Sequence, residues 1–299
     1  RLLFYMKTAI ERLNKLLDCN LSIIPIDQAK TPIIAWKKYQ TELISKEELL
    51  KHYDRAYSFG IATGYNNVEV IDIDLKILDS PKDQQDFINE FFAFCRDNID
   101  DFDKKFVIYK TINQGYHVIY RCKEITGNKK IAKLKDKKEA IIESRGIGGY
   151  VVIYENQKSL LSYSEIQEID AREREILWDI CKAFNYEEKP IKVEQTVQNE
   201  YQEQNITTWQ DYNEKTSIFD IVGNDFEIVR NISDRYIIKR HGSKSIHSGY
   251  IYKNSNCMFL FTTGTIYPNE QLISPFSAYA IRYHNADHKA AASDLYKKG

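Results

Sequence analysis

The segment over residues 68–75, which reads VEVIDIDL, constrains the fold of this chain more than any other. Successive side chains of a strand point to opposite faces, so Asp72 and Asp74 project together while the residues between them pack into the core. Carboxylates in such apolar surroundings are costly unless a positive group satisfies them. A pair of divalent cations, as used in phosphoryl transfer, is one solution. An edge strand with two solvated aspartates is the alternative, and a D-x-D motif alone does not decide between them.

Two further polar elements follow on predicted strands. Gly115 forms a turn, and His117 then lies on one face of the next strand. A histidine there is usually structural, but beside a triphosphate it can donate hydrogen bonds to phosphate oxygens. Further along, alternation puts Glu143 and Arg145 on one face, which offers a carboxylate for a metal ion and a guanidinium for phosphate. A cross-strand ion pair is the alternative.

Periodicity predicts an α+β chain. Helices are expected over residues 6–17, 45–53, 79–98, 164–185, 217–222 and 275–296. Strands are expected over residues 21–26, 68–75, 106–111, 116–122, 140–145 and 150–154. We expect the last two strands to pair with each other around the glycines between them.

Length and composition predict two domains. At 299 residues the chain is long enough for more than one hydrophobic core. Residues 187–207 are rich in Glu, Gln, Asn and Lys, which is typical of a linker. We therefore expect a larger domain over residues 1–186, this linker, and a small α+β domain over residues 208–299.

Composition also excludes some classes of protein. The sequence contains neither a signal peptide nor the run of about 20 apolar residues that crosses a bilayer, so no membrane partner is expected. The five cysteines include no CxxC pair and indicate free thiols in a reducing, cytoplasmic compartment. A net charge of −1 does not decide for or against nucleic acid, because local clustering matters more. Basic residues do cluster, over 129–138 and 235–244, although solvated surface is the simpler reading of such runs.

Taken in order, the polar elements resemble the three motifs of the prokaryotic primase-polymerase domain, in the archaeo-eukaryotic primase superfamily. The motifs read IDID at 71–74, GYH at 115–117, and ESRG with GGYVV over 143–152. The preceding segments also fit: IPI at 24–26, Lys30, Pro32, Trp36 and FGIATG at 59–64. The resemblance covers roughly residues 21–155.

This resemblance implies a primase catalytic core, in which an RNA-recognition-like (RRM-like) sheet bears the metal site beside an N-terminal α/β lobe. Three acidic residues would be catalytic and would bind two Mg²⁺ or Mn²⁺ ions: Asp72, Asp74 and Glu143. Three residues would bind the incoming nucleotide: His117, Arg145 and, as a further candidate, Lys110. The implied activity is that of a DNA primase/polymerase, which synthesises or extends primers on a single-stranded DNA template from nucleoside triphosphates.

The C-terminal part resembles the small domain between phage-type primase cores and their helicases. The matching segments read RHGSKS at 240–245, FLFTT at 259–263 and SPFSAYA at 274–280. The resemblance implies a zinc-module-like domain that has lost its metal ligands and contacts DNA through four basic residues: Arg235, Lys239, Arg240 and Lys244. A packing module with solvated lysines is the alternative. Because the chain begins with Arg1 and ends just after a helix, we expect a fragment of a longer primase-helicase, with a helicase domain C-terminal to it.

Two other functions are compatible with the same residues. A metal-dependent nuclease also uses clustered carboxylates, and pyrophosphate release from triphosphates would distinguish it from a polymerase. A non-catalytic DNA-binding module of a replication initiator would show only salt-sensitive DNA binding.

Overall fold

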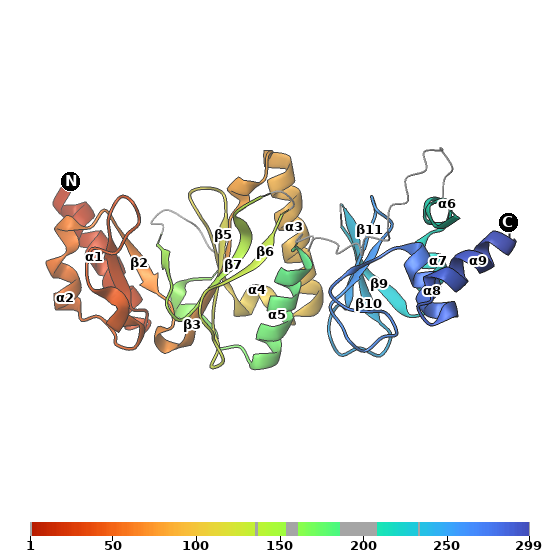
Figure 1. The fold of residues 1–299 in the computed structure, drawn as a ribbon. Coiled ribbons are helices and arrows are strands. Elements are labelled where there is room, and N and C mark those ends of the chain that lie inside the picture. The colour runs from red at the N-terminus through yellow and green to blue at the C-terminus, as the bar shows by residue number, and fades with distance from the viewer. Residues whose placement is uncertain (1, 135–136, 154–160, 186–207, 233, 299) are drawn as a thin grey trace. The chain divides into compact units, whose positions relative to one another are not determined.

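A computed structural model gives the fold of the chain and describes residues 2–134, 137–153, 161–185, 208–232 and 234–298 (Figure 1). The chain divides into two compact units, Arg1–Tyr186 and Glu187–Gly299. Each unit combines helices with antiparallel strands, so the predicted α+β class is confirmed. The predicted linker over residues 187–207 lies outside the described residues.

The first unit is built on a five-stranded antiparallel sheet with the strand order β4-β5-β3-β7-β6. Its strands are β3 (Val68–Ile73), β4 (Val107–Lys110), β5 (Tyr116–Arg121), β6 (Lys129–Lys133) and β7 (Ala140–Arg145). Three helices cover one face of this sheet: α3 (Pro81–Asn98), α4 (Phe102–Lys105) and α5 (Ala171–Ala183) (Figure 1). The segment that alternates apolar and acidic residues therefore forms the central strand.

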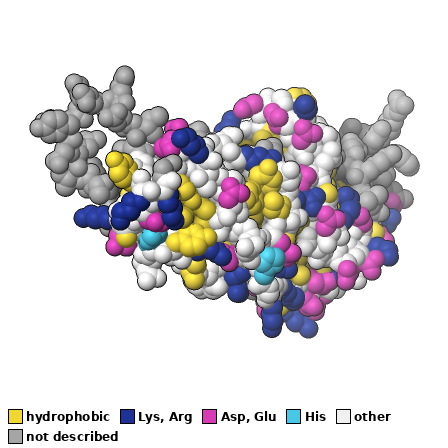
Figure 2. Space-filling model, turned by 90° about the vertical axis from the view of Figure 1, so that its right-hand side faces the viewer, with side chains coloured by type: hydrophobic (Ala, Val, Ile, Leu, Met, Phe, Trp, Pro, Cys, Tyr) yellow, Lys and Arg dark blue, Asp and Glu magenta, His cyan; other side chains and the backbone are white. Residues whose placement is uncertain are grey.

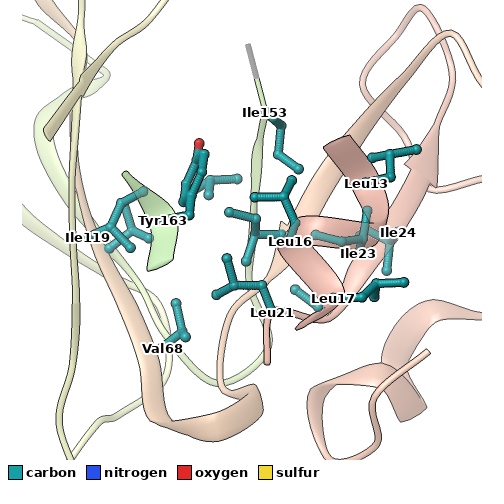
Figure 3. Close-up of a cluster of buried hydrophobic side chains, with 14 of the residues drawn as sticks. Leu13, Leu16, Leu17, Leu21, Ile23, Ile24, Val68, Ile119, Ile153 and Tyr163 are labelled. Carbon is teal, nitrogen blue, oxygen red and sulfur yellow. The ribbon is translucent and has the colours of Figure 1, made fainter. Parts of the chain in front are cut away.

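A smaller N-terminal lobe lies against the other face of this sheet. It contains a three-stranded sheet, β1 (Ile23–Ile26), β2 (Ser58–Ala62) and β8 (Tyr150–Val152), with helices α1 (Leu2–Asp18) and α2 (Lys46–Lys51). One apolar cluster joins the two sheets, because Leu16, Leu21 and Ile24 of the lobe share it with Val68 and Ile119 of the large sheet (Figure 3). Burial of this cluster holds the lobe against the face on which Asp72 lies.

The pairing of two strands differs from the prediction. Strand β8 pairs with β2 in the N-terminal lobe, whereas β7 lies between β3 and β6. The turn between β7 and β8 redirects the chain, with Gly148 at a φ of 90° and the Gly149 carbonyl accepting from the Thr63 N–H. The sequence predicts a solvated lysine run where the structure has strand β6; lysine is typical of edge strands such as this one.

Two predicted helices have different limits in the structure. Helix α5 begins at Ala171 rather than near residue 164, because Asp170 and Glu173 form a capping box there. The predicted closing helix is divided into α8 (Pro275–His284) and α9 (His288–Lys298). Asn285 and Ala286 adopt left-handed conformations that end the first helix, with φ of 50° and 64°.

The second unit contains a five-stranded antiparallel sheet with the order β13-β12-β11-β10-β9. Its strands are β9 (Phe226–Asn231), β10 (Arg235–Arg240), β11 (Gly249–Tyr252), β12 (Met258–Leu260) and β13 (Leu272–Ile273), and α6 (Thr208–Lys215) and α7 (Ile218–Val222) precede them. Residues of these strands, α7, α8 and α9 share one buried cluster, which includes Ile238, Leu260 and Ala278. In the described part of the chain, no helix combines the length and the apolar character needed to span a bilayer.

Candidate active site

A row of polar residues crosses the face of the large sheet that meets the N-terminal lobe. Asp72 on β3 lies directly between His117 on β5 and Glu143 on β7 in the strand register. Directly opposed residues have Cβ atoms about 4.5–5.5 Å apart, so these three side chains are neighbours. Asp74 follows the end of β3, where its backbone N–H donates to the Ile141 carbonyl at 2.9 Å. The sheet thus brings together four of the residues singled out in the sequence.

Ion pairs neutralise the carboxylates of this row. Arg145 lies with its Nη2 atom 2.5 Å from Glu143 Oε2 and its Nε atom 3.4 Å from Asp72 Oδ2. The Lys76 ammonium lies 2.7 Å from the carboxylate of Asp74. The cross-strand ion pair left open as an alternative is therefore present. The side chains of Asp72 and Arg145 are nevertheless 25% and 33% exposed, so a ligand can reach them.

His117 is the most buried member of the row. Its side chain is 8% exposed, and its Nε2 atom lies 3.6 Å from Asp72 Oδ1. Burial lowers the pKa of this imidazole below its ordinary value; Asp72 opposes the shift, and Arg145 and Lys30 add to it. The ring is therefore uncharged at neutral pH and can donate one N–H to a ligand.

A glycine sets the register of the histidine strand against β3. A Cβ atom on Gly115 would lie 2.3 Å from the Ile73 carbonyl oxygen, so another residue cannot approach the end of β3 this closely. The turn is closed by the Thr111 N–H, which donates to the Gly115 carbonyl at 2.8 Å. The glycine turn recognised in the sequence thus places His117 beside Asp72.

A cleft of about 300 Å³ opens beside the polar row. The large sheet contributes Asp72, His117 and Arg145 to its lining, while Lys30 and Tyr150 reach it from the N-terminal lobe. Asp74 also lines it. A ligand in this cleft would therefore lie between carboxylates on one side and a lysine on the other.

Lys30 is a cleft residue to which the sequence reasoning assigned no role. It has a φ of 64°, a left-handed conformation that lysine rarely adopts. The loop around it is closely held, because Asp27 Oδ1 accepts from the Thr31 N–H at 2.8 Å and the Lys30 carbonyl accepts from the Tyr150 hydroxyl at 2.8 Å. A non-glycine residue held in such a conformation at a cleft is typical of a functional position.

Lys110, the further candidate for nucleotide binding, is not brought to the cleft. It ends β4 on the opposite side of the sheet from His117, because Tyr109 is the residue paired with that histidine. Its ammonium lies 5.9 Å from the centroid of the Tyr116 ring. The neighbouring Thr111 lines the cleft instead.

A metal ion implied for these carboxylates fits the residues present. Among the described residues, no three Asp, Glu, His or Cys side chains form a ready-made metal site. Mg²⁺, however, usually binds through one or two carboxylates together with substrate phosphates and water. Asp72 and Glu143 lie opposite each other and Asp74 follows, and all three are partly exposed. This donor set suits ions that bind together with a nucleotide.

The four basic residues proposed to contact DNA in the second unit lie in different surroundings. Arg235 is 3% exposed, is paired with Asp234 and lies over the rings of Tyr250 and Tyr252. Its burial does not fit the expected contact with DNA, because its charge serves the packing of β10 on β11. Lys239 is partly exposed and Lys244 is exposed, while Arg240 lines a separate cleft.

Comparison with protein-family models gives a match within the first unit. The family model described as bifunctional DNA primase/polymerase, N-terminal, matches residues 14–163, which is half of the chain. The matched region contains the polar row, Lys30 and both sheets of the first unit. No curated protein matches the chain. The chain belongs to the bifunctional DNA primase/polymerase family.

Proposed function

We propose that this chain is a template-directed nucleotidyltransferase, which synthesises or extends primers on single-stranded DNA from nucleoside triphosphates. One observation carries the proposal: Asp72, Glu143 and His117 lie side by side beside a cleft, in a chain of the primase/polymerase family. We infer from the same arrangement that the five-stranded sheet is the RRM-like sheet of an archaeo-eukaryotic primase core.

The residues of the site divide into two groups by charge. Asp72, Asp74 and Glu143 would hold two Mg²⁺ or Mn²⁺ ions, which in such reactions activate the attacking 3′-hydroxyl and stabilise the departing pyrophosphate. Arg145 and His117 would bind the triphosphate. The Arg145 guanidinium would donate two parallel hydrogen bonds, and His117 would donate its single N–H. Catalysis then depends mainly on positioning and on electrostatic stabilisation.

A synthesis assay on single-stranded DNA tests this function. The chain is incubated with template, nucleoside triphosphates and Mg²⁺ or Mn²⁺, with and without an annealed primer, and product length and pyrophosphate are measured. We expect the amount of pyrophosphate to rise in proportion to the nucleotides incorporated into product. A chelator should abolish synthesis, and restoring the metal ion should recover it. Synthesis without a primer would identify a primase.

The same assay decides between the alternatives. A nuclease would shorten the DNA without releasing pyrophosphate from triphosphates. A replication-initiator module would bind DNA and give neither product, which would contradict the proposed activity. A helicase domain C-terminal to this chain, and DNA contacts by the second unit, belong to the same proposal.

Lys30 provides a prediction about nucleotide binding. Replacing Lys30 with alanine removes a cation that lines the same cleft as Arg145 and His117. We expect the KM for the nucleoside triphosphate to rise at least about tenfold, since a hydrogen bond to a charged group contributes roughly 1.5–3 kcal/mol. The value of kcat should change much less, because the acidic residues are untouched.

Lys37 offers a matched control for this variant. It lies seven positions further along the lobe, is exposed and does not line the cleft. Lys37→Ala is expected to leave KM within about twofold of the unaltered chain. If both variants raise KM equally, the effect comes from overall charge, and Lys30 does not bind the triphosphate.

A further inference from the structure

The second unit contains a cleft that the proposed catalytic site does not use. It has a volume of about 610 Å³ and is lined by Arg240 of β10, Arg282 of α8, His241, Asp225 and the loop around Gly264. Two arginines and a histidine against one acidic residue make its lining basic. Figure 2, which views the molecule from the right-hand side of Figure 1, shows basic, acidic and hydrophobic side chains interspersed on that face.

The two arginines of this cleft differ in their partners. Arg282 Nη1 donates to Asp225, and also to the Tyr267 hydroxyl at 3.1 Å. That pair leaves Asp225 neutralised. Arg240, by contrast, has no acidic partner among the residues that the structure describes, and its Nε atom is buried without a hydrogen-bond acceptor. An arginine whose charge no described carboxylate balances attracts an anionic ligand to the cleft that it lines.

The Gly264 loop holds the Arg240 guanidinium in place. A Cβ atom on Gly264 would lie 3.2 Å from Arg240 Nη2, so the loop backbone passes directly against the guanidinium. The Gly264 N–H in turn donates to Thr262 Oγ1 at 3.3 Å. An arginine confined in this way loses little side-chain freedom when it binds a ligand.

A second cleft adjoins the basic one. Thr265, Ile266 and Tyr267 line both, so the two clefts meet at this segment. The second cleft has a volume of about 550 Å³, and Leu272 and Ile281 contribute to its lining. An anionic group and an apolar ring can thus be held next to each other, and a nucleotide has this combination.

We infer that these adjoining clefts form a nucleotide-binding site separate from the cleft of the first unit, with the phosphate held by Arg240 and Arg282 and the base in the apolar cleft. Arginine suits this role, because its planar fork donates two parallel hydrogen bonds to phosphate oxygens. The phosphate can come from the 5′ end of a strand or from an internal phosphodiester. These sources share one chemistry, and the experiment distinguishes them.

Binding of short oligonucleotides tests the site. The full chain carries His117→Ala and Arg145→Ala and is kept in a chelator, so that phosphate contacts in the first unit are removed. Its affinity for fluorescent oligo-dT, with either a 5′-phosphate or a 5′-hydroxyl, is compared with that of the same chain carrying Arg240→Ala. We expect affinity to fall at least about tenfold, which corresponds to roughly 1.4 kcal/mol. Because no catalysis is measured, failure here is distinguishable from failure of nucleotidyl transfer.

Lys297 of α9 supplies the control, because it carries the same charge, is exposed and lines neither cleft. A loss confined to the 5′-phosphorylated strand would assign the terminal phosphate, and an equal loss for both strands would assign a phosphodiester. Either result supports the site. Unchanged affinity in Arg240→Ala, or an equal loss in Lys297→Ala, would overturn it.

Two further variants guard against a folding defect in Arg240→Ala. Arg240→Lys keeps the charge but loses the fork, so its affinity should lie between those of the alanine variant and the parent chain. Gly264→Ala leaves the charge unchanged and presses a methyl group against the guanidinium. It should weaken binding while the thermal unfolding curve keeps its cooperative form.

Discussion

Replacing Asp72 with asparagine is expected to lower the rate of primer extension on the order of 10³-fold, the loss typical of removing one preorganised electrostatic group from an active site. Asp72 occupies the central strand between His117 and Glu143 and lines the cleft. Asparagine keeps the size of the side chain but removes the charge that would bind a divalent ion. The apolar residues around it are unchanged, so the thermal unfolding midpoint should stay within a few degrees.

Asp79 provides the control for this substitution. Its side chain is 85% exposed and is paired only with Lys137 among the described residues. Asp79→Asn should extend primers as fast as the unaltered chain. If Asp72→Asn extended primers at the rate of this control, Asp72 would not take part in the reaction.

Replacing Arg174 with alanine is expected to lower the free energy of unfolding of the first unit by about 3–5 kcal/mol, as breaking a buried ion pair does. Arg174 of α5 donates to both carboxylate oxygens of Glu69 on β3, at 2.6 and 2.9 Å. The Glu69 side chain is fully buried and also accepts from the Tyr120 hydroxyl at 2.5 Å. Burial raises the pKa of Tyr120, so this hydroxyl stays protonated and cannot replace the lost cation.

Denaturant unfolding followed by tryptophan fluorescence measures this effect, since Trp178 lies 4.3 Å from the Arg174 guanidinium. Arg172, two residues earlier on α5, forms an exposed pair with Glu175 and serves as the control. Arg172→Ala should change the free energy of unfolding by less than about 1 kcal/mol. Equal destabilisation by both variants would show that α5 is held by its apolar face alone.

The acidic part of the site was predictable because it depends on short-range regularities. Strand alternation separates Asp72 from its buried neighbours on β3, Asp74 directly follows that strand, and the turn at Gly115 places His117 on the neighbouring strand. The partners of the buried charge at Glu69 were not predictable. Arg174 lies 105 residues away in the sequence, and no local pattern connects two residues at that separation.

The other differences between the prediction and the structure concern which strands pair and on which face of a sheet a side chain lies. The sequence predicts strand character for residues 150–152 but not the partner, because β2 and β7 are both suitable neighbours and only the tertiary fold selects β2. Arg235 and Arg240 belong to one basic run, yet alternation along β10 places them on opposite faces of the sheet. One arginine is therefore enclosed by tyrosines, and the other reaches a cleft.

The position of Arg145 has a thermodynamic consequence for the proposed reaction. Its guanidinium is paired with Asp72 and Glu143, two of the carboxylates proposed to bind the divalent ions. An ion that binds Asp72 and Glu143 must displace the guanidinium, which then becomes available to phosphate; a triphosphate that draws Arg145 away likewise vacates the carboxylates. Each ligand would thus free the side chains that the other ligand binds. By linkage the two would assist each other equally, so Arg145 would couple the proposed binding of metal and of nucleotide.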